Sequence, residues 1–230
     1  MISGGRREGY LEKTHRPLNC LVFVLPLILA NLIGIVSYGN RLLVSHHIGR
    51  LFGFLGLRGF FIPAAVVIVS LLLWHLVGRY SWEIDGVVLA GMVFESVVGT
   101  LPLFAAHLLT SRSLGSLMRW SDESVPKILS GIGAGVYEEF AFRLVGVGVV
   151  WFVLFRIFSV PKKIAIPITV VVISVLFSLY HFIGAEQFNE YRFLFRTFAG
   201  VYLAVVYLAR GFAIAAGTHA CYNVMVTVAW

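Results

Sequence analysis

Two adjacent glutamates, Glu138 and Glu139, lie inside a strongly apolar segment, and Arg143 follows one helical turn later. A carboxylate at membrane depth costs roughly 2.5 to 3.5 kcal/mol on insertion scales, so two in succession need a reason, and function is the default one. Residues four apart share a helix face, so we expect an ion pair between Glu139 and Arg143. Pairing would keep Glu139 ionised and fixed, and leave Glu138 available for proton transfer. The alternative is a buried ion pair that only fixes helix packing.

Two further groups of polar residues occur in later apolar segments. His181 ends the run 177–181, and His219 and Asn223 lie four residues apart in the last segment, hence on one helix face. Each group alone has a structural interpretation, His181 as a packed or interfacial residue and the other two as hydrogen-bonding groups between helices. Gathered with the glutamates around one cavity, they would hold a water, a base to activate it and donors for an oxyanion. This is the equipment for peptide hydrolysis without a covalent intermediate.

Other nucleophiles fit less well. Cys221 is two residues from His219, which places it on roughly the opposite side of a helix. We expect the Ser178 hydroxyl to bond back to its own helix. No Gly-x-Ser-x-Gly motif is present.

Three more polar side chains interrupt the apolar segments, namely His75, Glu95 and His107. Glu95 lies near the middle of its segment, where we expect a structural role, a pairing with a histidine or a place in the same cavity. His75 and His107 lie near segment ends and are expected at the membrane interface. None of the three is assigned to the site.

The composition defines the class of protein that positions these groups. The 230 residues are 59% hydrophobic and 13% charged, with mean hydropathy +0.91, whereas soluble domains are about 25% charged. Runs long enough to span a bilayer and the absence of period-2 alternation predict an all-α polytopic integral membrane protein with about seven to eight transmembrane helices. We expect a basic segment at 1–17 and one transmembrane domain at 18–230. The predicted spans are 18–39, 60–78, 86–109, 128–156, 164–184, 193–209 and 211–229.

The net charge of +7 does not indicate nucleic-acid binding, because the basic residues lie in short segments between apolar runs. They divide nine against eight between the two sides, so they do not set an orientation. The fourth span is long enough to tilt or break. The stretch Ser111 to Lys127 is predicted to form an interfacial helix. Nothing in the sequence sets the oligomeric state.

In order and spacing, the three groups resemble the CPBP (Abi) family of intramembrane proteases, which includes the type II CAAX prenyl endopeptidases. The resemblance covers about residues 125–226, which would be the protease-like core of a CAAX-protease-like bundle. The matching residues are Glu138, Glu139, Phe142 and Arg143, then Phe177 and His181, then His219 and Asn223.

The resemblance implies a role for each position. Glu138 would be the general base, with Glu139 and Arg143 orienting it and tuning its pKa. His181 would hold the water or transfer protons, and His219 with Asn223 would stabilise the oxyanion. We expect a metal-free glutamate mechanism without a cofactor. The alternative is a divalent metal such as zinc on Glu138, His181 and His219, a two-histidine, one-carboxylate set.

The predicted function is therefore an intramembrane endopeptidase that cuts a membrane-anchored or lipidated protein near its terminus. Its partners would be that protein or peptide substrate and the lipid bilayer, with no nucleic acid. A bacterial-type cytoplasmic (inner) membrane is the expected location. The alternatives are a proton- or cation-coupled transporter, since intramembrane carboxylates and histidines also build ion pathways, and a non-enzymatic immunity or scaffold relative.

Overall fold

The computed structural model describes residues 9–39, 61–110, 123–183 and 186–229. Within these ranges the chain is all-α, and six of its helices are long and apolar enough to cross a membrane. The chain is a polytopic membrane protein, as its composition predicts. In chain order the elements are α1 (Tyr10–Thr14), α2 (Pro17–Tyr38), α5 (Ile62–Val77), α6 (Gly86–Thr110), α7 (Ser124–Glu139), η2 (Phe140–Val147), α8 (Gly148–Phe152), η3 (Val153–Ile157), α9 (Lys162–Tyr180), α10 (Glu190–Arg210) and α11 (Phe212–Ala229).

Each predicted apolar run forms a helix in the structure. Six of the helical spans have 18 residues or more, and α5, with 16 residues, is a shorter apolar helix. The interfacial helix predicted for Ser111 to Lys127 falls mostly outside the described residues. Its last residues, from Ser124 onward, begin α7.

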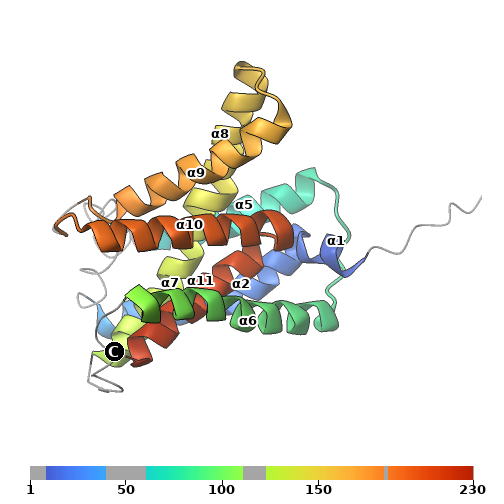
Figure 1. The fold of residues 1–230 in the computed structure, drawn as a ribbon. Coiled ribbons are helices and arrows are strands. Elements are labelled where there is room, and N and C mark those ends of the chain that lie inside the picture. Colours follow the sequence, from blue (N-terminus) through green and yellow to red (C-terminus); the bar gives the residue numbers. More distant parts are fainter. Residues whose placement is uncertain (1–8, 40–60, 111–122, 184–185, 230) are drawn as a thin grey trace, which may run out of the picture.

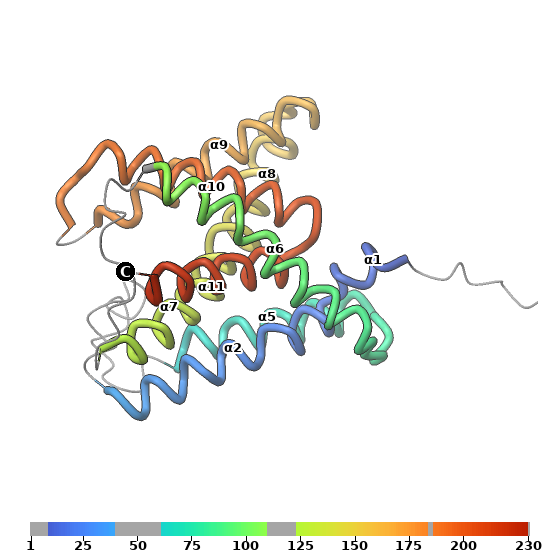
Figure 2. Tube along the Cα trace, turned by 60° about the horizontal axis from the view of Figure 1, so that its bottom comes forward, coloured from blue at the N-terminus to red at the C-terminus, as the bar shows by residue number. Residues whose placement is uncertain are grey.

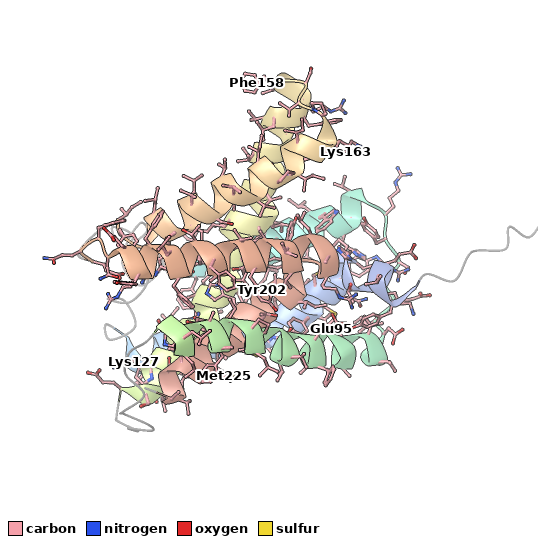
Figure 3. All side chains as sticks on the ribbon, in the orientation of Figure 1. Glu95, Lys127, Phe158, Lys163, Tyr202 and Met225 are labelled. Atoms are coloured by element: carbon pink, nitrogen blue, oxygen red, sulfur yellow. The ribbon has the colours of Figure 1, made fainter. Side chains whose placement is uncertain are left out.

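The fourth span is a continuous helix of 34 residues, Ser124–Ile157, in which α7, η2, α8 and η3 follow one another. At a rise of 1.5 Å per residue it is roughly 50 Å long, while the hydrocarbon core of a bilayer is about 30 Å thick. Its last turns and the start of α9 form a hairpin whose tip stands away from the other helices (Figures 1 and 2). Phe158 and Lys163 mark this tip (Figure 3).

The helix α11 lies at the centre of the bundle, where it packs against α7, α6, α10 and α2. Its first nine residues, 212–220, are all buried. Five of these nine are alanine or glycine, and small side chains allow helix backbones to approach closely in a membrane. The end of α9, the starts of α7 and α10 and the C-terminus lie at the same end of the bundle (Figures 1 and 2).

A polar cluster joins α1, α6 and α10 toward the end of the bundle opposite to the C-terminus. Lys13 lies 2.6 Å from Asp85, directly before α6, and Glu95 of α6 forms a two-point ion pair with Arg210 of α10. The predicted pairing of Glu95 with a histidine is therefore wrong, because the end of α10 brings a guanidinium to this carboxylate. Its structural role is confirmed.

His75, expected at the membrane interface, lies in the last turn of α5. Its side chain is buried and its ring meets the edge of the Trp82 ring, with centroids 4.3 Å apart. The segment after α5 folds back over the end of the helix and covers the imidazole.

Candidate active site

Glu138 and Glu139 lie at the end of α7, and both are buried. A close contact between α7 and α11 brings them to His219. At Gly135 an added Cβ would lie 2.6 Å from the backbone nitrogen of Ala220, so the two helices can touch only because residue 135 has no side chain. The turn of α7 that follows carries the glutamates, and His219 directly precedes Ala220.

One oxygen of Glu139 joins Arg143 and His219. Nη1 of Arg143 donates to Oε1 of Glu139 at 2.7 Å, and Nδ1 of His219 lies 2.8 Å from the same oxygen. The predicted ion pair between Glu139 and Arg143 is therefore confirmed. An ionised carboxylate only accepts hydrogen bonds, so Nδ1 of His219 carries a proton. Nε2 of the same ring is turned toward Glu138.

Arg143 is fully buried in η2 and reaches two further groups. Nη2 donates to the carbonyl of Gly200 on α10 at 3.2 Å, and the guanidinium carbon lies 4.4 Å from the centre of the Phe177 ring. The arginine therefore ties η2 to α9 and α10. The π-helical turns begin directly after Glu139, a form of helix that is frequent at functional sites.

Phe177 packs against the aromatic rings around the site. Its ring is buried and meets the rings of Phe142, His181 and His219 edge to face, with centroids 5.3, 4.8 and 5.9 Å away. Both imidazoles are therefore supported by one aromatic ring.

His181 lies directly beyond the last residue of α9. Its Nδ1 is 2.8 Å from the carbonyl oxygen of Phe177, which can only accept, so Nδ1 is the donor and Nε2 of the neutral ring is an acceptor. Burial lowers the pKa of His181, and the Glu138 carboxylate acts in the opposite direction without overcoming it. The neutral imidazole is thus favoured.

The two imidazoles meet at Glu138. Oε2 of Glu138 lies 3.7 Å from Nε2 of His181 and 3.9 Å from Nε2 of His219. Both distances are longer than a direct hydrogen bond and fit groups that share a bridging water. Glu138, Glu139, Arg143, His181 and His219, five of the six residues named from the sequence, are therefore linked in one network.

The sixth residue, Asn223, is one turn further along α11 and has a different partner. Its Nδ2 donates to the carbonyl of Gly131 on α7 at 2.9 Å. The side chain also lines the same cavity as His181 and His219. The structure thus places Asn223 beside the site, with one of its amide donors engaged by the α7 backbone.

A cavity of about 630 Å³ adjoins this network, within the range of ligand pockets. Its walls come from α6, α9, α10 and α11, and its rim includes the exposed side chains of Tyr191 and Arg192. The apolar part of the lining includes Leu103, Phe177, Phe195, Ala199 and Leu203.

Several lining residues were not assigned from the sequence. His107, expected at the interface, faces the cavity and lies 2.9 Å from the hydroxyl of Tyr222. Arg192 and Arg196 also line it. Their spacing of four in the first turns of an apolar helix, which places them on one face, was the available signal.

The expectation for the Ser178 hydroxyl is wrong. The hydroxyl of Ser178 donates to the carbonyl of Phe193 on α10 at 2.8 Å, and not to its own helix. The contact is possible because α9 and α10 pack closely, with Gly200 against Ser174.

Among the described residues, no three His, Cys, Asp or Glu side chains are grouped so that they could hold a metal ion.

Residues 120–225 match the family model described as type II CAAX prenyl endopeptidase Rce1-like. This segment is an Rce1-like domain. It runs from α7 to α11 and contains every residue of the network and Asn223, which confirms the family resemblance seen in the sequence. The chain is therefore a multi-pass membrane protein whose second half resembles the type II CAAX prenyl endopeptidases. A search of the curated proteins and of the solved structures finds no match.

Proposed function

We propose that the chain is an intramembrane endopeptidase in which Glu138 activates a water for attack on a peptide bond. The observation that carries this proposal is the placement of two imidazole Nε2 atoms within 4 Å of one oxygen of Glu138, beside a cavity of peptide size. A general base must lie within hydrogen-bond reach of the water that it deprotonates, and these three groups can share one.

The proposed step conserves every atom and proton. Glu138 takes one proton from water as the water oxygen bonds to the peptide carbonyl carbon, and the carbonyl π electrons move onto its oxygen. Collapse of this tetrahedral intermediate breaks the C–N bond. Glu138 returns its proton to the leaving nitrogen, which gives a carboxylic acid and an amine.

The hydrogen bonds of the two histidines suggest different roles. His181 holds its Nδ1 proton on a carbonyl, so its neutral Nε2 can accept a hydrogen bond from the water. His219 directs Nδ1 at the Glu139 carboxylate, which fixes the ring with Nε2 toward Glu138. A proton on Nε2 would be donated to the oxyanion from this position, together with the remaining amide donor of Asn223.

The proposed mechanism has no metal step. In the alternative, Glu138, His181 and His219 would hold a zinc ion that activates the water. The described residues do not group three such side chains as a metal site, so no step is assigned to zinc. In the proposed scheme Arg143 and Glu139 act by holding His219 in place.

The proposed substrate is a membrane-anchored or lipidated protein cut near its terminus. The family description names CAAX prenyl proteins, whose prenylated cysteine lies close to the C-terminus. A protein with a C-terminal anchoring helix is the second form of such a substrate. The substrate would enter from the lipid, and water would arrive from the end of the bundle where the cavity rim is exposed.

The variant Glu138→Gln tests the general base. The amide keeps the size of the side chain but cannot accept the proton, so we expect cleavage to fall at least about hundredfold. The measurement is cleavage of a quenched fluorescent farnesylated CAAX peptide by the purified protein in detergent.

The matched control is Glu123→Gln, which removes an exposed carboxylate at the start of α7 and should leave cleavage unchanged. Activity that survives in Glu138→Gln would contradict the proposed base. Chelation of divalent ions should leave the cleavage rate of the wild-type protein unchanged. A loss of cleavage on chelation, with recovery on adding zinc, would favour the metal alternative.

A further inference from the structure

A carboxylate-binding pair of arginines lies on the rim of the active-site cavity. Arg196 contacts Glu186 at two points, Nη1 to Oε1 and Nη2 to Oε2, both at 3.1 Å. Arg192 donates from Nη1 to Oε1 of the same carboxylate at 2.9 Å. Two parallel N–H···O bonds are the geometry by which a guanidinium recognises a carboxylate, so the structure shows this site with a carboxylate in it.

The pair belongs to the same cavity as the catalytic network. Both arginines line the cavity with His181, His219 and Asn223. A peptide lying in the cavity would therefore meet the arginines at one end and the network at the other.

The arginines retain binding capacity while Glu186 is present. Two positive charges face one carboxylate, which leaves one net positive charge on these three side chains. Each guanidinium has five N–H donors, so two arginines offer far more than the two oxygens of Glu186 use. The side chain of Arg192 is 64% exposed, so it can turn toward an incoming group.

The carboxylate that occupies the site is not on a helix. Glu186 lies before α10 and belongs to neither α9 nor α10. Burial acts to raise the pKa of Glu186, but the hydrogen bonds from Arg196 and Arg192 outweigh it and hold this pKa below its ordinary value. The residue is thus an ionised internal ligand for the two arginines.

We propose that Arg192 and Arg196 bind the free C-terminal carboxylate of the peptide substrate, and that Glu186 takes its place when no substrate is bound. The inference rests on the proposed endopeptidase function and adds to it the residues that read the substrate end. It also sets the direction of the peptide. The C-terminal end lies against α10, and the bond that is cut lies upstream of it, at Glu138, His181 and His219.

A binding experiment with three peptides tests this assignment. The peptides share one farnesylated CAAX sequence and end in a free carboxylate, in an amide, or in an amide preceded by an aspartate. They are titrated against the detergent-solubilised Glu138→Gln protein, which holds the peptide without cutting it. We expect the free acid to bind at least about tenfold more tightly than the plain amide, the size of effect of a charge-assisted hydrogen bond.

Variants locate the effect in the arginines. Arg196→Gln should reduce binding of the free acid to the level of the amide and leave amide binding unchanged. Glu186→Gln removes the internal competitor and should strengthen binding of the free acid. The matched control is Arg156→Gln, an exposed arginine on the far hairpin, which should change neither. Unchanged amide binding shows that each variant is folded, and Arg196→Lys gives a second, milder substitution.

Three results would overturn the proposal. The first is that the free-acid peptide and the plain amide peptide bind equally well, or that neither binds. The second is a loss of both peptides in equal measure in Arg196→Gln, which would make the cluster a brace for the chain before α10. The third is equal binding of the free acid and the aspartate amide, which would assign the arginines to an acidic side chain. The proposed function fails separately, if Glu138→Gln cleaves the free-acid peptide at the wild-type rate.

Discussion

At the scale of single residues, Arg143 and Glu139 act on the chemistry through His219. The guanidinium is fully buried and bonded to Glu139, and Glu139 in turn fixes the proton of His219 on Nδ1. A buried ion pair is weak evidence for stability, because desolvation offsets most of the attraction. Its value here lies in orientation, since it determines which nitrogen of His219 faces Glu138.

Arg143→Met, alone and combined with Glu139→Leu, separates these roles. Arg143→Met leaves the Glu139 carboxylate buried without its partner, so we expect a loss of about 3 to 5 kcal/mol in the free energy of unfolding. Adding Glu139→Leu replaces the whole pair with apolar groups of similar size and should restore most of that stability. Cleavage should remain at least about hundredfold reduced in both, because Glu139 has lost the arginine that holds it in the single variant and is absent, leaving His219 unanchored, in the double variant.

The measurements are thermal unfolding in detergent and cleavage of the farnesylated peptide. Normal cleavage by the restored double variant would show that the pair serves folding alone. Glu139 and Arg143 would then be a buried ion pair that only fixes helix packing.

At the scale of elements, the site depends on how closely α7 approaches α11. The contact of Gly135 with the backbone of Ala220 sets this distance, and the residues that it aligns, Glu139 and His219, lie within one turn on either helix. Small residues are used in this way throughout the packing of helices in membranes.

Gly135→Ala should therefore damage the site without touching any of its side chains. The new Cβ would lie 2.6 to 2.7 Å from backbone atoms of Ala220, so the helices must separate. We expect a cost of about 1 to 3 kcal/mol in stability and a fall in kcat of up to about a hundredfold, because a displacement of about 1 Å misplaces catalytic groups. The assay is steady-state cleavage with a parallel unfolding curve.

Gly148→Ala is the matched control, since this glycine lies on the same continuous helix with nothing within 4 Å of an added Cβ. It should be neutral or slightly stabilising, because alanine has the higher helix propensity. Equal behaviour of the two variants would show that the approach of α7 to α11 does not set the geometry of the site.

What the sequence could and could not predict follows from the range of each interaction. The ion pair of Glu139 with Arg143 was predictable because helix geometry fixes the relation of residues four apart. The spans were predictable because a bilayer demands apolar runs of set length. The pairing of Glu95 with Arg210 and the bond from Ser178 to Phe193 depend on which helices become neighbours, and no local pattern encodes that. The π-helical turns around Arg143 were missed for the same reason.

At the scale of the whole molecule, the helices that precede the Rce1-like segment support the one that carries the glutamates. Asn31 of α2 is buried, and its Nδ2 donates to the carbonyl of Leu129 on α7 at 3.0 Å. The hydroxyl of Tyr137 donates to Oδ1 of the same amide at 3.2 Å. Tyr137 directly precedes Glu138, so one side chain from the first half of the chain holds α7 at two points, one of them next to the proposed base.

Asn31→Ala should weaken this junction between the two halves. It leaves the Tyr137 hydroxyl and the Leu129 carbonyl without the amide, and we expect a loss of about 1 to 2 kcal/mol, near the upper range for hydrogen bonds between membrane helices. Tyr137→Phe removes only one of the two bonds and should cost less. In the double variant the losses should not add, because the phenolic bond is already absent in either single variant. Unfolding curves of the four proteins give the coupling, and strictly additive losses would show that Asn31 does not hold Tyr137.

Below the unfolding temperature, cleavage by Asn31→Ala should fall more than cleavage by Tyr137→Phe, since the amide anchors α7 on both sides of the turn that leads to Glu138.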